Sequence, residues 1–177
     1  EISACLVGSE MCIRDSNGNI VMAAKQAAEV SDIPVGIVPT KTISQGLTAM
    51  LSFNPDASVD ENVEAMTEDL DTVVSGEVTQ ATRDTEIDEV EIHKNDYLGI
   101  VDGKIKVDNA DLIKTTVDMI EKMLDEDSEI ITIMFGRDAS EEQAQEVVEQ
   151  LEAKHDDLEF EIHDGGQPVY HFLVSVE

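Results

Sequence analysis

Apolar residues in the first part of the chain follow two spacings. Residues 17–30 (NGNIVMAAKQAAEV) place apolar side chains every three or four positions, which predicts a helix with an alanine-rich face. Residues 33–39 (IPVGIVP) form a short, continuously apolar run that contains two prolines. Such a run is typical of a strand buried in a parallel sheet. A helix followed by a buried strand indicates an α/β unit.

Two more helices are predicted before the chain changes character. Residues 40–53 (TKTISQGLTAMLSF) favour a helix, with Ser44 as its expected N-cap. Ser58 and Glu61 have the S-x-x-E spacing of a capping box, which predicts a third helix to about Val74. The α/β unit is therefore expected to extend over residues 17–75.

After Ser75 and Gly76 the apolar residues alternate with polar ones, which predicts strands. Asp102 and Gly103 are expected to form the turn of a β-hairpin. An amphipathic helix is predicted over residues 108–127.

The remaining residues continue this alternation of helices and strands. Residues 129–136 (EIITIMFG) favour a buried strand, and Ser140 with Gln143 forms a second capping box for a helix to about Lys154. Residues 158–177 predict a strand, a Gly-Gly turn and a final strand. The expected fold class is α/β followed by α+β, in which a C-terminal α+β sandwich over residues 76–177 carries its helices on one sheet face.

The strongly negative net charge of the chain excludes some classes of partner. The chain has 40 acidic and 11 basic residues and a net charge of -29. A surface this acidic repels phosphates, so neither nucleic acid nor an anionic membrane is an expected partner. The charge serves either to solvate the surface or to steer a basic partner protein. No apolar run approaches the roughly 20 residues of a membrane span, and the start lacks a basic signal region, so a cytoplasmic location is expected.

The two cysteines lie in an unusual N-terminal segment. Cys5 and Cys12 match no common zinc spacing and do not make a disulfide framework. Residues 6–16 (LVGSEMCIRDS) correspond to a translated transposase sequencing adapter with its mosaic end. Residues 1–16 are therefore interpreted as an adapter-derived artefact, poorly packed and with unpaired cysteines. The natural sequence would then begin near Asn17, partway through a longer protein.

The loop at residues 39–46 is the strongest candidate binding site. It follows a buried strand and leads into a helix, where anionic ligands bind in open α/β sheets. The polar residues that could hold a carboxylate or phosphate there are Thr40, Lys41, Thr42 and Ser44. A capped strand-to-helix turn with a solvated Lys41 is the favoured alternative.

The histidines offer weaker candidates. His163 and His171 flank the Gly-Gly turn, so a hairpin would bring them together, with Asp164 as a third metal ligand. Exposed or hydrogen-bonded histidines are the favoured alternative, and the same holds for His93 and His155. No metal site and no catalytic residue is expected, because neither a Ser-His-Asp arrangement nor a phosphate-binding glycine motif is present.

Several segments together resemble a known family. They are NIVMAAKQAAEV, VPTKTISQGLTAMLSFNP, VTQATRDTEID, YLGIVDGKI, DEDSEIITIMFGRDASEEQAQ and EIHDGGQPVYHFLVSVE. From Asn17 to Glu177 the chain resembles the C-terminal region of the dihydroxyacetone-kinase-like fatty acid kinases of Gram-positive bacteria. In fold, the resemblance implies a truncated unit of the DegV-like (EDD-type) fatty-acid-binding proteins.

The resemblance also implies a function. The parent would be an ATP-dependent kinase, compatible with a homodimer, that phosphorylates fatty acids to acyl phosphates for phospholipid synthesis. ATP and Mg would bind aspartates of an N-terminal domain that this chain lacks, so the chain alone would be inactive and hold no cofactor. Its expected role is to bind an acyl-carrying DegV-type protein. The alternative is a small-ligand domain that binds a fatty acid or phosphate at residues 39–46.

Overall fold

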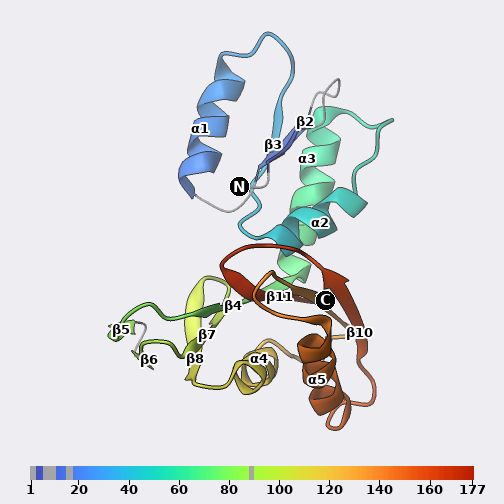
Figure 1. Cartoon of the computed structure of the whole chain (residues 1–177). Coiled ribbons are helices and arrows are strands. Elements are labelled where there is room, and N and C mark those ends of the chain that lie inside the picture. Colours follow the sequence, from blue (N-terminus) through green and yellow to red (C-terminus); the bar gives the residue numbers. More distant parts are fainter. Residues whose placement is uncertain (1–2, 6–10, 15–17, 88–89) are drawn as a thin grey trace. The chain divides into compact units, whose positions relative to one another are not determined.

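The computed structural model describes residues 3–5, 11–14, 18–87 and 90–177 (Figure 1). The chain divides into two compact units, Glu1–Val73 and Val74–Glu177. The sequence placed this boundary between residues 75 and 76, which lies inside a strand of the second unit.

The first unit combines short strands with three α-helices. Its elements are β1 (Ser3–Cys5), β2 (Met11–Arg14), α1 (Gly18–Glu29), β3 (Gly36–Val38), α2 (Ile43–Leu51), α3 (Val59–Glu68) and the 3-10 turn η1 (Asp69–Thr72). The sheet order is β1-β2-β3, with β1 antiparallel to β2 and β2 parallel to β3. The predicted helix, strand, helix, helix order over residues 18–72 is therefore present.

Capping interactions determine where two of these helices begin. Ser58 and Glu61 form the predicted capping box of α3. The N-cap of α2 is Thr42 and not Ser44, because Thr42 has extended backbone and its hydroxyl accepts a hydrogen bond from the Gln45 amide at 3.2 Å. Ser44 lies inside the helix and is buried. Helix α3 ends at Glu68, earlier than predicted, because the chain tightens into η1.

A small apolar core holds the first unit together. Val38, Ala49, Met66 and Leu70 form this core. Gly36 allows β3 to approach α3 closely, since a Cβ atom there would lie 2.5 Å from Cγ2 of Val63. The sequence of β3 therefore fits a strand packed tightly under a helix.

The N-terminal residues contribute two strands to the first unit. Met11–Arg14 pairs with β3 in the register Met11 to Gly36, which the adapter interpretation did not predict. The interpretation of residues 1–16 as an artefact nevertheless stays a prediction. Residues 1–2, 6–10 and 15–17 lie outside the described part of the chain, and so do the side chains of the two cysteines.

The second unit is built on a six-stranded mixed sheet with the order β10-β9-β11-β4-β7-β8. Its strands are β4 (Val74–Gln80), β7 (Tyr97–Val101), β8 (Lys104–Asn109), β9 (Ile130–Phe135), β10 (Glu159–Asp164) and β11 (Tyr170–Val176). Strands β9 and β10 are parallel, and the other neighbouring strands are antiparallel. A two-stranded ribbon, β5 (Thr85–Ile87) and β6 (Val90–Ile92), lies beside β8.

Two helices, α4 (Leu112–Ile120) and α5 (Glu141–Glu152), pack against the sheet and each other (Figure 1). The core between helices and sheet is aliphatic apart from Phe172, and includes Met119, Ile131, Ile133 and Leu151. Gly76 is central to it, because a Cβ atom there would lie 2.6 Å from Sδ of Met123. The glycine that suggested a domain break thus makes room for a helix over β4.

In the second unit, two of the predicted turns and caps are confirmed and one is wrong. The Asp102-Gly103 hairpin between β7 and β8 and the capping box of Ser140 and Gln143 are confirmed. The predicted C-terminal hairpin is wrong, because β9 lies between β10 and β11. The Gly-Gly segment is instead part of a crossover past the end of β9, where the Gly165 amide bonds the Phe135 carbonyl at 3.0 Å.

The chain is therefore a mixed α/β protein whose larger sheet is also mixed. The finer expectation, a truncated α/β unit followed by an α+β sandwich, stays a prediction. No helix among the described residues combines the length and apolarity needed to cross a membrane.

Candidate functional site

The loop from residue 39 to 46 joins β3 to the N-terminus of α2. The Thr40 amide donates to the Val38 carbonyl at 2.9 Å, which turns the chain sharply after the strand. The Lys41 amide donates to Oε1 of Gln45 at 2.9 Å. Nε2 of Gln45 donates in turn to the Leu70 carbonyl at 3.2 Å. One side chain therefore fixes both the loop and the position of η1 relative to α2.

The four residues predicted from the sequence have different environments. Thr40 and Ser44 are buried, at 1% and 5% exposure. Lys41 is exposed to solvent. Thr42 is the N-cap of α2. The structure thus gathers the four residues in one loop, with only the lysine presenting its side chain freely to water.

This arrangement suits both alternatives left open by the sequence. The cap formed by Thr42 is what a structural strand-to-helix turn requires. The positive end of the helix dipole and the Lys41 ammonium also attract a carboxylate to the same point. The loop therefore stays a candidate anion site at the end of a strand that is parallel to its neighbour β2.

An apolar stripe runs along α2 from that loop. Leu47 and Leu51 are one helical turn apart and are 55% and 83% exposed. Neighbouring exposed aliphatic side chains offer an apolar surface that a ligand or partner could cover. A carboxylate at the start of α2 would therefore have an apolar track beside it.

His163 and His171 do not form the metal-binding pair that was the weaker candidate from the sequence. His163 is exposed on β10 and lies 3.3 Å from Oε2 of Glu161. His171, on β11, contacts the Tyr97 ring edge-on at a centroid distance of 5.1 Å. Its Nδ1 is buried without a hydrogen-bond partner in the described part of the chain, and this burial lowers the pKa of His171. The intervening strand β9 separates the two histidines.

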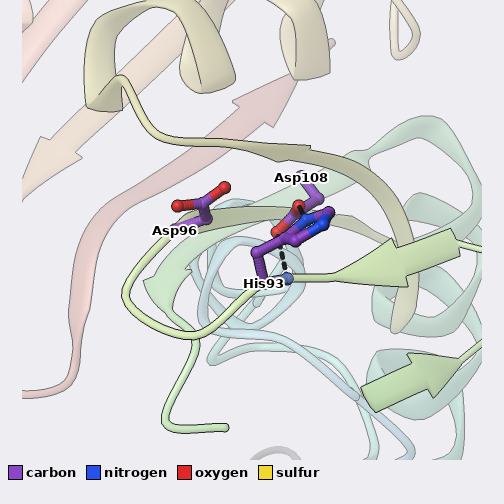
Figure 2. Close-up of side chains that lie close together, drawn as sticks. All are labelled: His93, Asp96 and Asp108. Carbon is purple, nitrogen blue, oxygen red and sulfur yellow. Dashed lines mark hydrogen bonds and ion pairs between the residues drawn. The ribbon is translucent and has the colours of Figure 1, made fainter. Parts of the chain in front are cut away.

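A different cluster of polar side chains lies near β6 and β8. His93 follows β6, Asp96 precedes β7, and Asp108 belongs to β8. Nδ1 of His93 is 2.8 Å from Oδ2 of Asp108, and one ligand atom from each residue lies within 4.8 Å of the others (Figure 2). The hydrogen bond that the Asp108 carboxylate accepts, aided by the charges of Asp108, Glu91 and Asp96, raises the pKa of His93.

The sequence did not predict this cluster, because its third member, Asp108, is distant from His93 and Asp96 along the chain. His93 and Asp108 are 15 positions apart and meet only because the β5–β6 ribbon lies against β8. The H-x-x-D spacing of His93 and Asp96 was the available local signal. That spacing alone does not indicate a metal site, because the cluster also requires Asp108.

Comparison with known proteins identifies the family. The model of the FakA-like C-terminal family, named for fatty acid kinases, matches residues 12–177. Uncharacterized proteins of Staphylococcus aureus strains USA300 and MRSA252 are 39% identical over 165 residues, which is 93% of this chain. The chain spans 30% of the length of these relatives.

Solved structures with a similar fold include proteins described with a bound fatty acid or with a fatty-acid-binding function. The Streptococcus pneumoniae fatty acid kinase B3 protein loaded with linoleic acid has a TM-score of 0.62 at 10% identity, covering 97% of this chain and 73% of its own. A DegV family protein of Corynebacterium glutamicum has a TM-score of 0.61 at 14% identity, covering 94% and 72%. A Thermotoga maritima protein, described as revealing fatty acid binding function, has a TM-score of 0.58 at 14% identity, covering 95% and 69%.

These findings correct the identification made from the sequence. The chain was expected to be the C-terminal region of a dihydroxyacetone-kinase-like fatty acid kinase, and that description is wrong. The structures that it resembles along almost its whole length are DegV-family proteins, including a B-type fatty acid kinase protein. A homodimeric parent gains no support from them. The chain has a DegV-like fold and belongs to the FakA-like C-terminal family.

Proposed function

We propose that this chain is a docking domain of a fatty acid kinase assembly and binds an acyl-carrying DegV-type protein. The observation that carries the proposal is the family match over residues 12–177, whose description ties the chain to a fatty acid kinase. The domain would hold the acyl carrier in position while another part of the assembly transfers the phosphoryl group. Whatever the transfer machinery is, docking would raise the local concentration of the fatty acid carboxylate.

Charge supports docking of a protein with a basic face. The chain carries a net charge of -29, and the exposed face of α5 is densely acidic. Residues of this face that line a shallow hollow are Glu141, Glu142, Gln145, Glu146 and Glu149. Complementary charge accelerates association and suppresses wrong partners, and salt screens it.

A pull-down tests this proposal. The full chain is immobilised and exposed to the DegV-type proteins encoded in the same genome, each loaded with a fatty acid. We expect at least one of them to be retained, with less retained at about 300 mM salt than at about 50 mM, because the Debye length shortens. Failure of every acyl-loaded candidate to bind would contradict the proposal.

A second candidate function is binding of a fatty acid by the chain itself. It is favoured by the exposed Leu47 and Leu51, which follow the candidate anion site at the start of α2. The carboxylate would lie at the start of α2 beside Lys41, the exposed member of the predicted set, and the alkyl chain would cover the two leucines. Burial of those side chains would contribute roughly 1.5–3 kcal/mol each.

Native mass spectrometry with added oleate distinguishes the two candidates. Lipid binding predicts a one-to-one adduct that Leu47→Glu or Leu51→Glu reduces at least tenfold. The matched control Met22→Glu, at a methionine that is 63% exposed on α1, would leave the adduct unchanged. Absence of any adduct from a chain that retains its carrier protein would exclude this second function.

A further inference from the structure

The cluster of His93, Asp96 and Asp108 has the composition of a metal site. One imidazole and two carboxylates are brought together from the end of β6, the turn before β7 and the edge strand β8 (Figure 2). Imidazole nitrogen and carboxylate oxygen are ordinary ligands of divalent transition metals such as zinc. All three residues lie within the second compact unit, so the cluster depends on no contact between units.

The turn that carries two of the ligands is firmly anchored. The Asp96 amide bonds the His93 carbonyl at 3.1 Å, and Asn95 has a φ of 71°. Ala81 holds both sides of the turn, since its amide donates to the Asp96 carbonyl at 2.8 Å and its carbonyl accepts from the Asn95 amide at 2.9 Å. The ligands therefore project from a backbone that is already in place.

A small apolar cluster packs next to the residues that carry the proposed ligands. Ala81, Ile92 and Leu98 are each less than 9% exposed and pack together with Ile105. Ile92 immediately precedes His93, and Ile105 is on the same strand as Asp108. Rigid support of this kind is what a precise ligand geometry needs.

The cluster pairs a nearly buried carboxylate with an exposed imidazole. The Asp108 side chain is only 7% exposed, whereas its ion-pair partner His93 is 59% exposed. A nearly buried carboxylate requires a compensating partner, and a divalent cation held jointly with the imidazole would supply it.

We propose that His93, Asp96 and Asp108 bind a divalent transition metal ion, with zinc as the reference ion. Ligand atoms around a tetrahedral zinc ion are separated by about 3.4 Å, so atoms within 4.8 Å reach it by small side-chain rotations. Water completes the coordination on the exposed side of His93. Metal binding at Nδ1 of His93 displaces the hydrogen that lies toward Asp108. A neutral ring then carries its proton on Nε2, and a protonated ring releases one proton to solvent.

The proposed ion would clip the ribbon and turn to the edge of the large sheet. Strand β8 is an outer strand of the six, and β6 lies against it. A cation bound to residues of both segments stabilises the folded state over the unfolded state by mass action. This structural role is independent of partner docking and of lipid binding.

Calorimetric titration of zinc into the metal-stripped full chain tests the proposal. The same titration uses a Cys5→Ser, Cys12→Ser chain, because thiolates are strong zinc ligands. We expect one site per chain in both, a raised midpoint of thermal unfolding, and at least about tenfold weaker binding in His93→Gln and Asp108→Asn. His163→Gln, which alters another exposed histidine beside an acid, is the matched control.

Resonances of the imidazole rings give a readout that does not depend on the variants. Zinc should shift the His93 ring nitrogens of the unmutated chain and leave those of His163 in place. If Asp108→Asn fails to fold, the exposed-side variant Asp96→Asn and this spectrum still decide the question. Absence of binding at about 100 µM zinc, or binding unaffected by His93→Gln, would overturn the proposal.

Discussion

At the scale of single residues, the environment of each side chain decides its role more than its type does. The four histidines show this. His93 gains a proton-stabilising carboxylate, whereas His171 is placed against Tyr97 with a buried, unpartnered nitrogen. The strand sequences around them were readable, but the pairing of strands that sets these environments is non-local and could not be derived from periodicity.

His171 predicts a specific pH dependence of stability. Burial lowers the pKa of His171 in the folded chain, an effect that the charge of Asp138 partly opposes. The unfolded chain therefore takes up the proton first, and stability falls as the pH drops below about 6.5, the unperturbed histidine value. Above that pH the contribution is fully present.

Urea unfolding at about pH 7.5 and about pH 5.5, with a chelator present, measures this effect. His171→Phe keeps an aromatic ring against Tyr97 and removes the titrating group. We expect the unmutated chain to lose more free energy of unfolding between the two pH values than His171→Phe does. Equal losses in the two proteins would show that His171 does not titrate differently on folding.

At the scale of elements, the parts of the fold set by neighbouring residues were predictable. Both capping boxes and the Asp102-Gly103 hairpin are local patterns, and all three are present. Residues 158–177 form the two predicted strands, β10 and β11. The predicted hairpin between them is wrong, because β9 lies between these strands in the sheet. Local sequence defines the strands here, and long-range pairing defines their order.

The capping box of α5 carries the prediction at this scale. Ser140 accepts a hydrogen bond from the Gln143 amide at 3.3 Å, and Oε1 of Gln143 accepts from the Ser140 amide at 3.0 Å. Ser140→Ala removes the first bond and should lower the free energy of unfolding by about 1 kcal/mol. Denaturant unfolding measures the loss. Ser140→Thr retains the hydroxyl and should lose much less; equal losses would mean that the cap contributes little.

At the scale of the whole molecule, one candidate site could be predicted from the sequence and the other could not. The loop at residues 39–46 was found because strand, loop and helix are consecutive in the chain. The metal cluster needed the β5–β6 ribbon to lie against β8, which no local pattern specifies. The family resemblance pointed to fatty acid kinases, and the DegV-like fold corrected the dihydroxyacetone-kinase-like part of that identification.

The central claim is that this chain docks an acyl-carrying DegV-type protein, and its affinity for that partner is the most direct test. Isothermal titration of the full chain with the fatty-acid-loaded partner from the same genome should give one-to-one binding with a dissociation constant of about 10 µM or below. Raising the salt from about 50 mM to about 300 mM should weaken that binding several-fold. No measurable binding at the lower salt concentration would contradict the account.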